Sequence, residues 1–146
     1  MADAGKRPPH VFTDDEMARM REAEKKQIEE ERTYRMQAPR MRIPWRIKKG
    51  EIIRVLVKIR HPNRTGLRMR QDGSFVRSRP AFYIRLVEVF YGGELVTKLE
   101  PNSAVGDDPI FGFHLRADKE APLRVVFTNH RDERSEAVKR VAFAAD

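Results

Sequence analysis

The sequence predicts an all-β fold, an immunoglobulin-like β-sandwich of about seven strands preceded by a charged N-terminal α-helix. Two observations predict it. From residue 42 onward, short segments alternate apolar and polar side chains with a period of two, as half-buried strands do. Before residue 39, acidic and basic residues follow one another and apolar residues are scarce, which favours a solvated helix. We therefore divide the chain into an N-terminal extension, residues 1–40, and a sandwich domain, residues 41–146.

The helix is expected over about residues 14–35. Thr13 can cap its first free amides, and Glu16, three residues later, can return the hydrogen bond. One interpretation is a solvated helix held together by its own ion pairs. The other is a docking arm in which Met17 and Met20, on one face, contact a partner surface. The sequence leaves both interpretations open.

Seven segments are candidate strands of the sandwich. They lie near residues 43–47, 52–60, 81–91, 95–99, 111–115, 123–127 and 141–143. Gly92 and Gly93 suit the two positive-φ positions of a hairpin turn between the third and fourth segments. A change of apolar phase in the third segment predicts a bulge or a doubly buried strand end near Glu88. About seven short strands in roughly 100 residues are typical of an immunoglobulin-like sandwich.

Composition excludes several classes of protein. No apolar run approaches the roughly 20 residues that span a bilayer, and residues 1–10 lack the pattern of a secretory signal, so we expect none. Cysteine is absent, which excludes disulfides, thiolate metal ligands and a thiol nucleophile. The net charge of +8 would suit a nucleic-acid partner. The cations are dispersed, however, and no nucleic-acid-binding motif is present, so this partner is not favoured.

The candidate catalytic groups do not form a recognisable site. The four histidines, His10, His61, His114 and His130, are far apart and lack metal-binding spacing. No serine occupies a nucleophile elbow, and no glycine-rich phosphate loop is present. His61, before a proline at a strand end, is expected to satisfy loop carbonyls rather than transfer protons. We therefore expect no catalytic, cofactor-binding or metal-binding residues and no enzyme activity.

Short motifs in residues 42–143 occur in an order that resembles the Z subunit of the bacterial sulfur-oxidation (Sox) carrier complex, the SoxZ family. The loop residues that resemble the family's His-Pro-Met-x-Thr-Gly-x-Arg motif are His61, Pro62, Thr65, Gly66 and Arg68. Further resemblances lie, in order, at residues 48–52, 91–96, 108–111 and 127–128. Asn63 stands where the family has methionine, and residues 1–39 have no counterpart, which indicates a divergent member.

The resemblance implies a carrier subunit that has no catalytic role and no cofactor. Its partner would be a Y-type subunit, in a heterodimer or larger complex, whose C-terminal cysteine arm carries sulfur intermediates during thiosulfate and sulfur oxidation. Sulfur-oxidation enzymes would dock transiently. The location implied is the periplasm, reached by export together with a signal-bearing partner; without that partner the chain would be cytoplasmic.

Two surfaces are candidates for these contacts. We hypothesise that Val87, Val89 and Leu95 pack against the Y-type partner through a face or edge of the sandwich. A basic rim could steer anionic groups or acidic docking enzymes, or could simply be solvated. The rim consists of Arg64, Arg68, Arg70, Arg77 and Arg79.

Two alternatives from other classes stay open. A structural or assembly subunit would use the N-terminal helix to bind a larger complex, so deleting residues 1–40 would abolish association and leave the sandwich folded. A nucleic-acid-binding protein would be retained on DNA or RNA with a steep salt dependence.

Overall fold

The structure, a computed structural model, describes residues 11–102 and 105–145, and the chain divides into two units. The sandwich unit lies within Arg35–Thr65 and Phe82–Asp146, and the helix–hairpin unit lies within Met1–Tyr34 and Gly66–Ala81. The sequence-based division assigns residues 66–81 to the sandwich, whereas the structure groups them with the helix. Each unit is described separately below.

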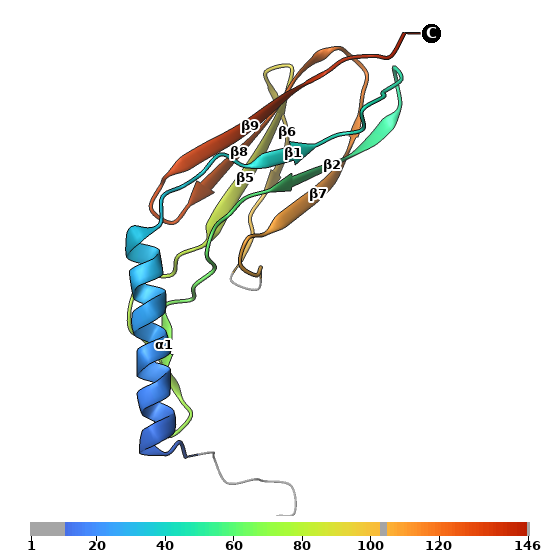
Figure 1. Ribbon diagram of the computed structural model, residues 1–146. Coiled ribbons are helices and arrows are strands. Elements are labelled where there is room, and N and C mark those ends of the chain that lie inside the picture. The colour runs from blue at the N-terminus through green and yellow to red at the C-terminus, as the bar shows by residue number, and fades with distance from the viewer. Residues whose placement is uncertain (1–10, 103–104, 146) are drawn as a thin grey trace, which may run out of the picture. The chain divides into compact units, whose positions relative to one another are not determined.

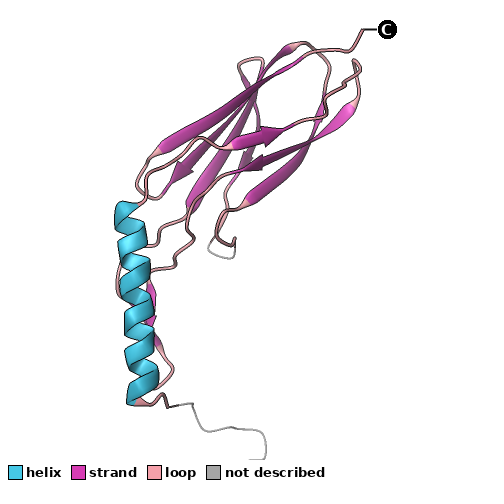
Figure 2. Ribbon diagram, in the orientation of Figure 1, coloured by secondary structure: helices cyan, strands magenta, loops and turns pink. Residues whose placement is uncertain are grey.

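Two antiparallel sheets form the sandwich unit (Figures 1 and 2). The three-stranded sheet has the order β1-β2-β7, and the four-stranded sheet has the order β6-β5-β8-β9. The strands are β1 (Arg40–Arg42), β2 (Ile52–Lys58), β5 (Ile84–Tyr91), β6 (Glu94–Leu99), β7 (Ile110–Arg116), β8 (Ala121–Asn129) and β9 (Arg134–Val141). The predicted all-β sandwich of about seven strands is confirmed.

The core of the sandwich comes from the inward faces of both sheets. Val55 and Val57 of β2 are fully buried. Arg54, which lies between the buried residues Ile53 and Val55, is exposed. Val125 and Phe127 of β8 are also fully buried and belong to the same cluster. Successive side chains of a strand point to opposite faces, so the period-two pattern translates directly into this burial. Each such side chain contributes about 1.5–3 kcal/mol when it leaves water.

The hairpin between β5 and β6 has the predicted turn. Gly92 and Gly93 have φ angles of 61° and 86°, values that favour glycine. The register of β5 is irregular on both sides of Glu88, just before Leu86 against β8 and just before Phe90 against β6. The predicted bulge is therefore present as two irregularities that flank the expected position.

Two predicted strand positions are wrong. The first strand lies at Arg40–Arg42 and not at residues 43–47, where Pro44 has no amide hydrogen to donate to a ladder. The last strand begins at Arg134, seven residues before Val141, where it ends. Its exposed polar residues hide the apolar alternation on which the prediction depended.

The helix–hairpin unit contains α1 (Asp14–Thr33) and a two-stranded ladder of β3 (Leu67–Met69) and β4 (Phe75–Arg77). The predicted capping box is present. Thr13 Oγ1 accepts a hydrogen bond from the Glu16 amide (3.2 Å), and Glu16 Oε2 accepts one from the Thr13 amide (2.8 Å). In the part of the chain that the structure describes, no helix is both long enough and apolar enough to cross a membrane.

Candidate functional site

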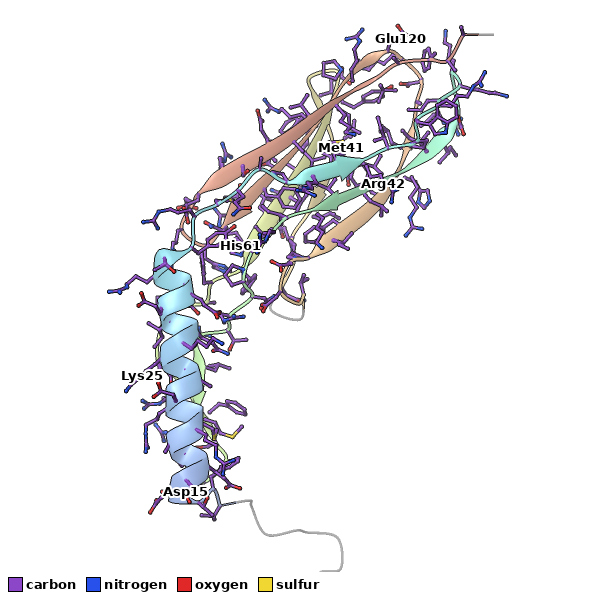
Figure 3. The ribbon with its side chains drawn as sticks, in the orientation of Figure 1. Asp15, Lys25, Met41, Arg42, His61 and Glu120 are labelled. Carbon is purple, nitrogen blue, oxygen red and sulfur yellow. The ribbon has the colours of Figure 1, made fainter. Side chains whose placement is uncertain are left out.

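His61 lies at the end of the sandwich where β2 ends and β5 begins (Figure 3). Only 1% of the residue is exposed. Its backbone amide donates to Asp108 Oδ1 (3.0 Å), and its ring lies 4.7 Å from the ring of Phe82. The Arg131 guanidinium covers the Phe82 ring at 3.8 Å, a cation–π contact. The loop end of the sandwich is thus closed by a stack of side chains.

Both ring nitrogens of His61 are engaged. Asn129 Nδ2 donates to Nε2 (3.1 Å), so Nε2 must be the acceptor nitrogen of a neutral ring. Nδ1 then carries the proton and donates to the carbonyl oxygen of Pro62 (2.6 Å). The expectation that His61 satisfies loop carbonyls is confirmed, and the ring has no nitrogen left to act as a base toward a ligand.

Asn129, at the end of β8, is the centre of this buried network. It is completely buried. Its Oδ1 accepts from the amides of Arg131 (2.9 Å) and Glu133 (3.1 Å), while Nδ2 also donates to Glu133 Oε1 (3.1 Å). The sequence analysis missed this role, although an asparagine two residues before a turn amide is a recognised signal for such a side-chain turn. Asn129 links His61 to the β8–β9 turn.

The burial of His61 makes the stability of the sandwich depend on pH. Burial lowers the pKa of His61 below its ordinary value, and the Pro62 carbonyl and Glu133 oppose this only in part. In the unfolded chain the ring takes up a proton as the pH falls through about 6.5. Between that pH and the lower folded pKa, the unfolded state binds more protons, so stability decreases as the pH falls. This contribution is complete above about pH 6.5 and is lost toward the folded pKa.

We therefore expect the free energy of unfolding to fall between about pH 7.5 and about pH 5.5. Urea titrations at both values measure it. His61→Gln removes the titrating ring and should flatten this pH dependence. An equal pH dependence in the parent and in His61→Gln would contradict the assignment.

The family-like loop is shared between the two units. His61, Pro62 and Thr65 belong to the sandwich unit, whereas Gly66 and Arg68 belong to the helix–hairpin unit. Gly66 has a φ of 77°, and a Cβ atom there would overlap the carbonyl oxygen of its neighbour Arg79. The backbone position therefore requires glycine. The loop therefore connects the two units along the chain.

The basic rim is only partly exposed. Arg64 Nη1 pairs with Asp107 Oδ1 at 2.7 Å, and its side chain is 14% exposed. Arg79 pairs with Glu31 at 3.0 Å and is 13% exposed. These two cations are already neutralised, so the part of the steering hypothesis that uses them is wrong. The remaining three, Arg68, Arg70 and Arg77, are exposed, and a steering role for them stays a prediction.

The residues predicted to contact a partner differ in how exposed they are. Val87 and Val89 are completely buried in the core, because they lie on the inward face of β5, and they are not available to a partner. That part of the hypothesis is wrong. Leu95 on β6 is 51% exposed. Met17 and Met20 are half-buried on α1, and a docking role for them stays a prediction.

Among the described residues, 11–102 and 105–145, no group of three or more histidine, aspartate or glutamate side chains is arranged to hold a metal ion. His10 lies outside the described residues. His130 contacts Tyr83, and its Nδ1 lies 3.0 Å from the Tyr83 carbonyl oxygen. It belongs to no metal-binding group among the described residues.

Comparison with protein families gives one match. Residues 41–140, well over half of the chain, match the family model described as "Sulphur oxidation protein SoxZ". No curated protein matches the sequence. The matched range begins within β1 and ends within β9, so it includes most of the sandwich and the intervening hairpin.

Solved structures share the fold at low sequence identity. A superoxide reductase (neelaredoxin) from Ignicoccus hospitalis matches with a TM-score of 0.56 and 17% identity, over 75% of this chain and 82% of that chain. A variant of superoxide reductase (neelaredoxin) from Archaeoglobus fulgidus gives 0.51 and 17%, over 74% and 90%. The sulfur carrier protein SoxY from Chlorobium limicola gives 0.46 and 16%, over 71% and 73%. At these identities the two superoxide reductases show a shared fold alone.

Proposed function

Because the chain belongs to the SoxZ family of sulphur oxidation proteins, we propose that it is the non-catalytic subunit of a sulfur carrier complex. Its partner is a Y-type subunit whose C-terminal cysteine arm carries sulfur intermediates during thiosulfate and sulfur oxidation. One observation carries the proposal: these 146 residues contain no cysteine. Sulfur carried as a covalent thiol derivative therefore needs a cysteine from another chain.

The edge strand β6 is the surface that best suits this pairing. In the order of the described strands, β6 ends the four-stranded sheet and pairs only with β5. Two adjacent apolar residues on it, Leu95 and Val96, are 51% and 46% exposed. An edge strand with exposed apolar side chains offers both backbone hydrogen bonds and apolar area to a partner. The opposite edge, β9, suits pairing less well, because its exposed Val138 is followed by Lys139 and Arg140.

Copurification from native cells, followed by intact-mass spectrometry, tests the proposal. The tagged chain should retain a Y-type subunit whose terminal cysteine bears sulfur-dependent mass additions. Leu95→Asp should weaken retention by about tenfold, since it places a charge in an apolar contact. The matched control Val138→Asp, an equally exposed position on the other edge strand, should leave retention unchanged. Copurification without any cysteine-bearing chain, or equal losses in both variants, would contradict the proposal.

The proposed location follows from the same partner. The complex acts in the periplasm, and this chain reaches it by export together with the signal-bearing subunit. Fractionation of the cells used for copurification tests this. The tagged chain should move from the periplasmic to the cytoplasmic fraction when the Y-type gene is deleted; an unchanged distribution would exclude export with that partner.

A second function is favoured by one feature of the helix–hairpin unit. Met20 of α1 lines a cavity of about 220 Å³ together with Leu67 and Met69 of β3. Methionine adapts to irregular apolar partners, so this unit could anchor the chain in a larger assembly as a structural subunit. In the same copurification, a large assembly that lacks a cysteine-bearing chain and is lost on Met20→Asp would support this function over the carrier role.

A further inference from the structure

The outward face of the three-stranded sheet carries cations and no carboxylates. The register places Arg40 opposite Lys58 across β1 and β2, and Arg54 opposite His114 across β2 and β7. We call this surface the basic sheet face. Its charged or titratable residues, all exposed, are Arg40, Arg42, Arg54, Lys58, His114 and Arg116 (Arg42 is labelled in Figure 3). Neither aspartate nor glutamate occurs in β1, β2 or β7.

The charges of this face are not neutralised within the described residues. The ion pairs among the described residues involve other cations, and none of them joins a cation of the basic sheet face to a carboxylate. The outward face of the four-stranded sheet differs, because Arg124 pairs with Glu136 (3.4 Å) and Arg134 pairs with Glu88 (3.7 Å). The four-stranded sheet therefore pairs some of its exposed cations with carboxylates of its own strands, and the three-stranded sheet does not.

The arrangement of the cations costs stability in the isolated chain. Like charges directly opposite each other on neighbouring strands are destabilising, and Arg40 faces Lys58 in this way. These two side chains, with Arg60, also line a cavity of about 340 Å³. Its one carboxylate, Asp108, already accepts a hydrogen bond from the His61 amide (3.0 Å) through Oδ1. A carboxylate from outside the chain would relieve this repulsion.

Aliphatic side chains lie among the cations. Ile52 and Ile110, at opposite ends of the ladder, are 57% and 61% exposed. Leu56 is half-buried between them, and Gly112 lies directly opposite, where a Cβ atom would approach Leu56 Cδ2 to 3.1 Å. Because Gly112 has no side chain, the surface beside Leu56 is not covered at this position. Apolar area surrounded by charged residues is the usual composition of a protein interface.

We propose that the basic sheet face is a docking surface for an acidic protein partner. Charge complementarity selects the partner, because five exposed arginines and lysines lack carboxylates on their own sheet. Protein is favoured over nucleic acid, since the residues between the cations are aliphatic and the strand aromatics, Phe111 and Phe113, pack against the core. Single-stranded nucleic acid is usually bound by exposed aromatic side chains. This surface is separate from the proposed pairing through β6, which belongs to the other sheet.

A titration of the isotope-labelled full chain with a synthetic acidic peptide of alternating glutamate and leucine tests the inference by NMR. At low salt, shift changes should be confined to amides of β1, β2 and β7, and the affinity should fall as salt is added. The double variant Arg54→Glu with Lys58→Glu should weaken binding by about tenfold or more. The matched control, Lys139→Glu with Arg140→Glu on β9, lowers the net charge equally and should change binding by less than about twofold.

Three outcomes would overturn the inference. Equal losses in the two double variants would mean that only net charge matters. Shift changes outside the three strands would place the contact elsewhere. A short DNA duplex that binds the same face more tightly than the peptide would identify a nucleic-acid surface instead. Because the peptide binds without a Y-type subunit, each outcome can be separated from failure of the carrier proposal.

Discussion

The Asn129→Ala variant is expected to lower the free energy of unfolding of the sandwich unit by about 3 kcal/mol or more. Asn129 is completely buried and makes hydrogen bonds to the His61 ring, to the Glu133 carboxylate and to two turn amides. Alanine cannot replace them, so the buried His61 ring and three part-buried polar groups would lose a partner at once. Each such group costs about 1–3 kcal/mol.

Urea unfolding followed by far-UV circular dichroism measures the effect. Asn63→Ala is the matched control: Asn63 is only half-buried, and its side chain makes no hydrogen bond within the described residues. We expect that variant to change the free energy of unfolding by less than about 0.5 kcal/mol. If Asn129→Ala cost under about 1 kcal/mol, the network would contribute little to stability.

The features that the sequence predicts correctly depend on neighbouring residues. Alternation in β2 specifies its buried face, because the side-chain period of a strand is two. Gly92 and Gly93 specify the β5–β6 turn through their positive φ angles. Thr13 and Glu16 specify the helix start through two hydrogen bonds three residues apart. Each of these rules acts within a few residues, so no knowledge of the tertiary fold is needed.

The features that the sequence does not predict depend on distant residues. Arg79 follows other arginines and looks like a solvated cation, but its partner Glu31 lies 48 residues earlier in the chain. His61 and Asn129 are 68 residues apart. Val87 is apolar, as a residue that contacts a partner would be. Only the pairing of β5 with β6 and β8 determines that it faces the core. Sheet order is a tertiary property, and local patterns do not encode it.

Replacing Arg79 by methionine is expected to destabilise the helix–hairpin unit by about 3–5 kcal/mol. Arg79 Nε lies 3.2 and 3.1 Å from the two carboxylate oxygens of Glu31, and Nη2 lies 3.0 Å from one of them. The Glu31 side chain is only 8% exposed. Methionine keeps much of the side-chain volume but leaves this buried carboxylate without its cation, which is costly in a site of low dielectric.

Hydrogen exchange of the α1 amides measures the effect, because most of the stability of a helix in a protein comes from its tertiary packing. Arg79→Met should accelerate exchange throughout α1, whereas Arg68→Met, at an exposed position of β3, should not. Adding Glu31→Met to Arg79→Met should restore much of the protection, since an apolar pair of similar volume often replaces a buried ion pair without loss. If α1 exchanged at the parent rate in Arg79→Met, or if the second substitution made exchange faster still, the ion pair would not be what holds the helix in this unit.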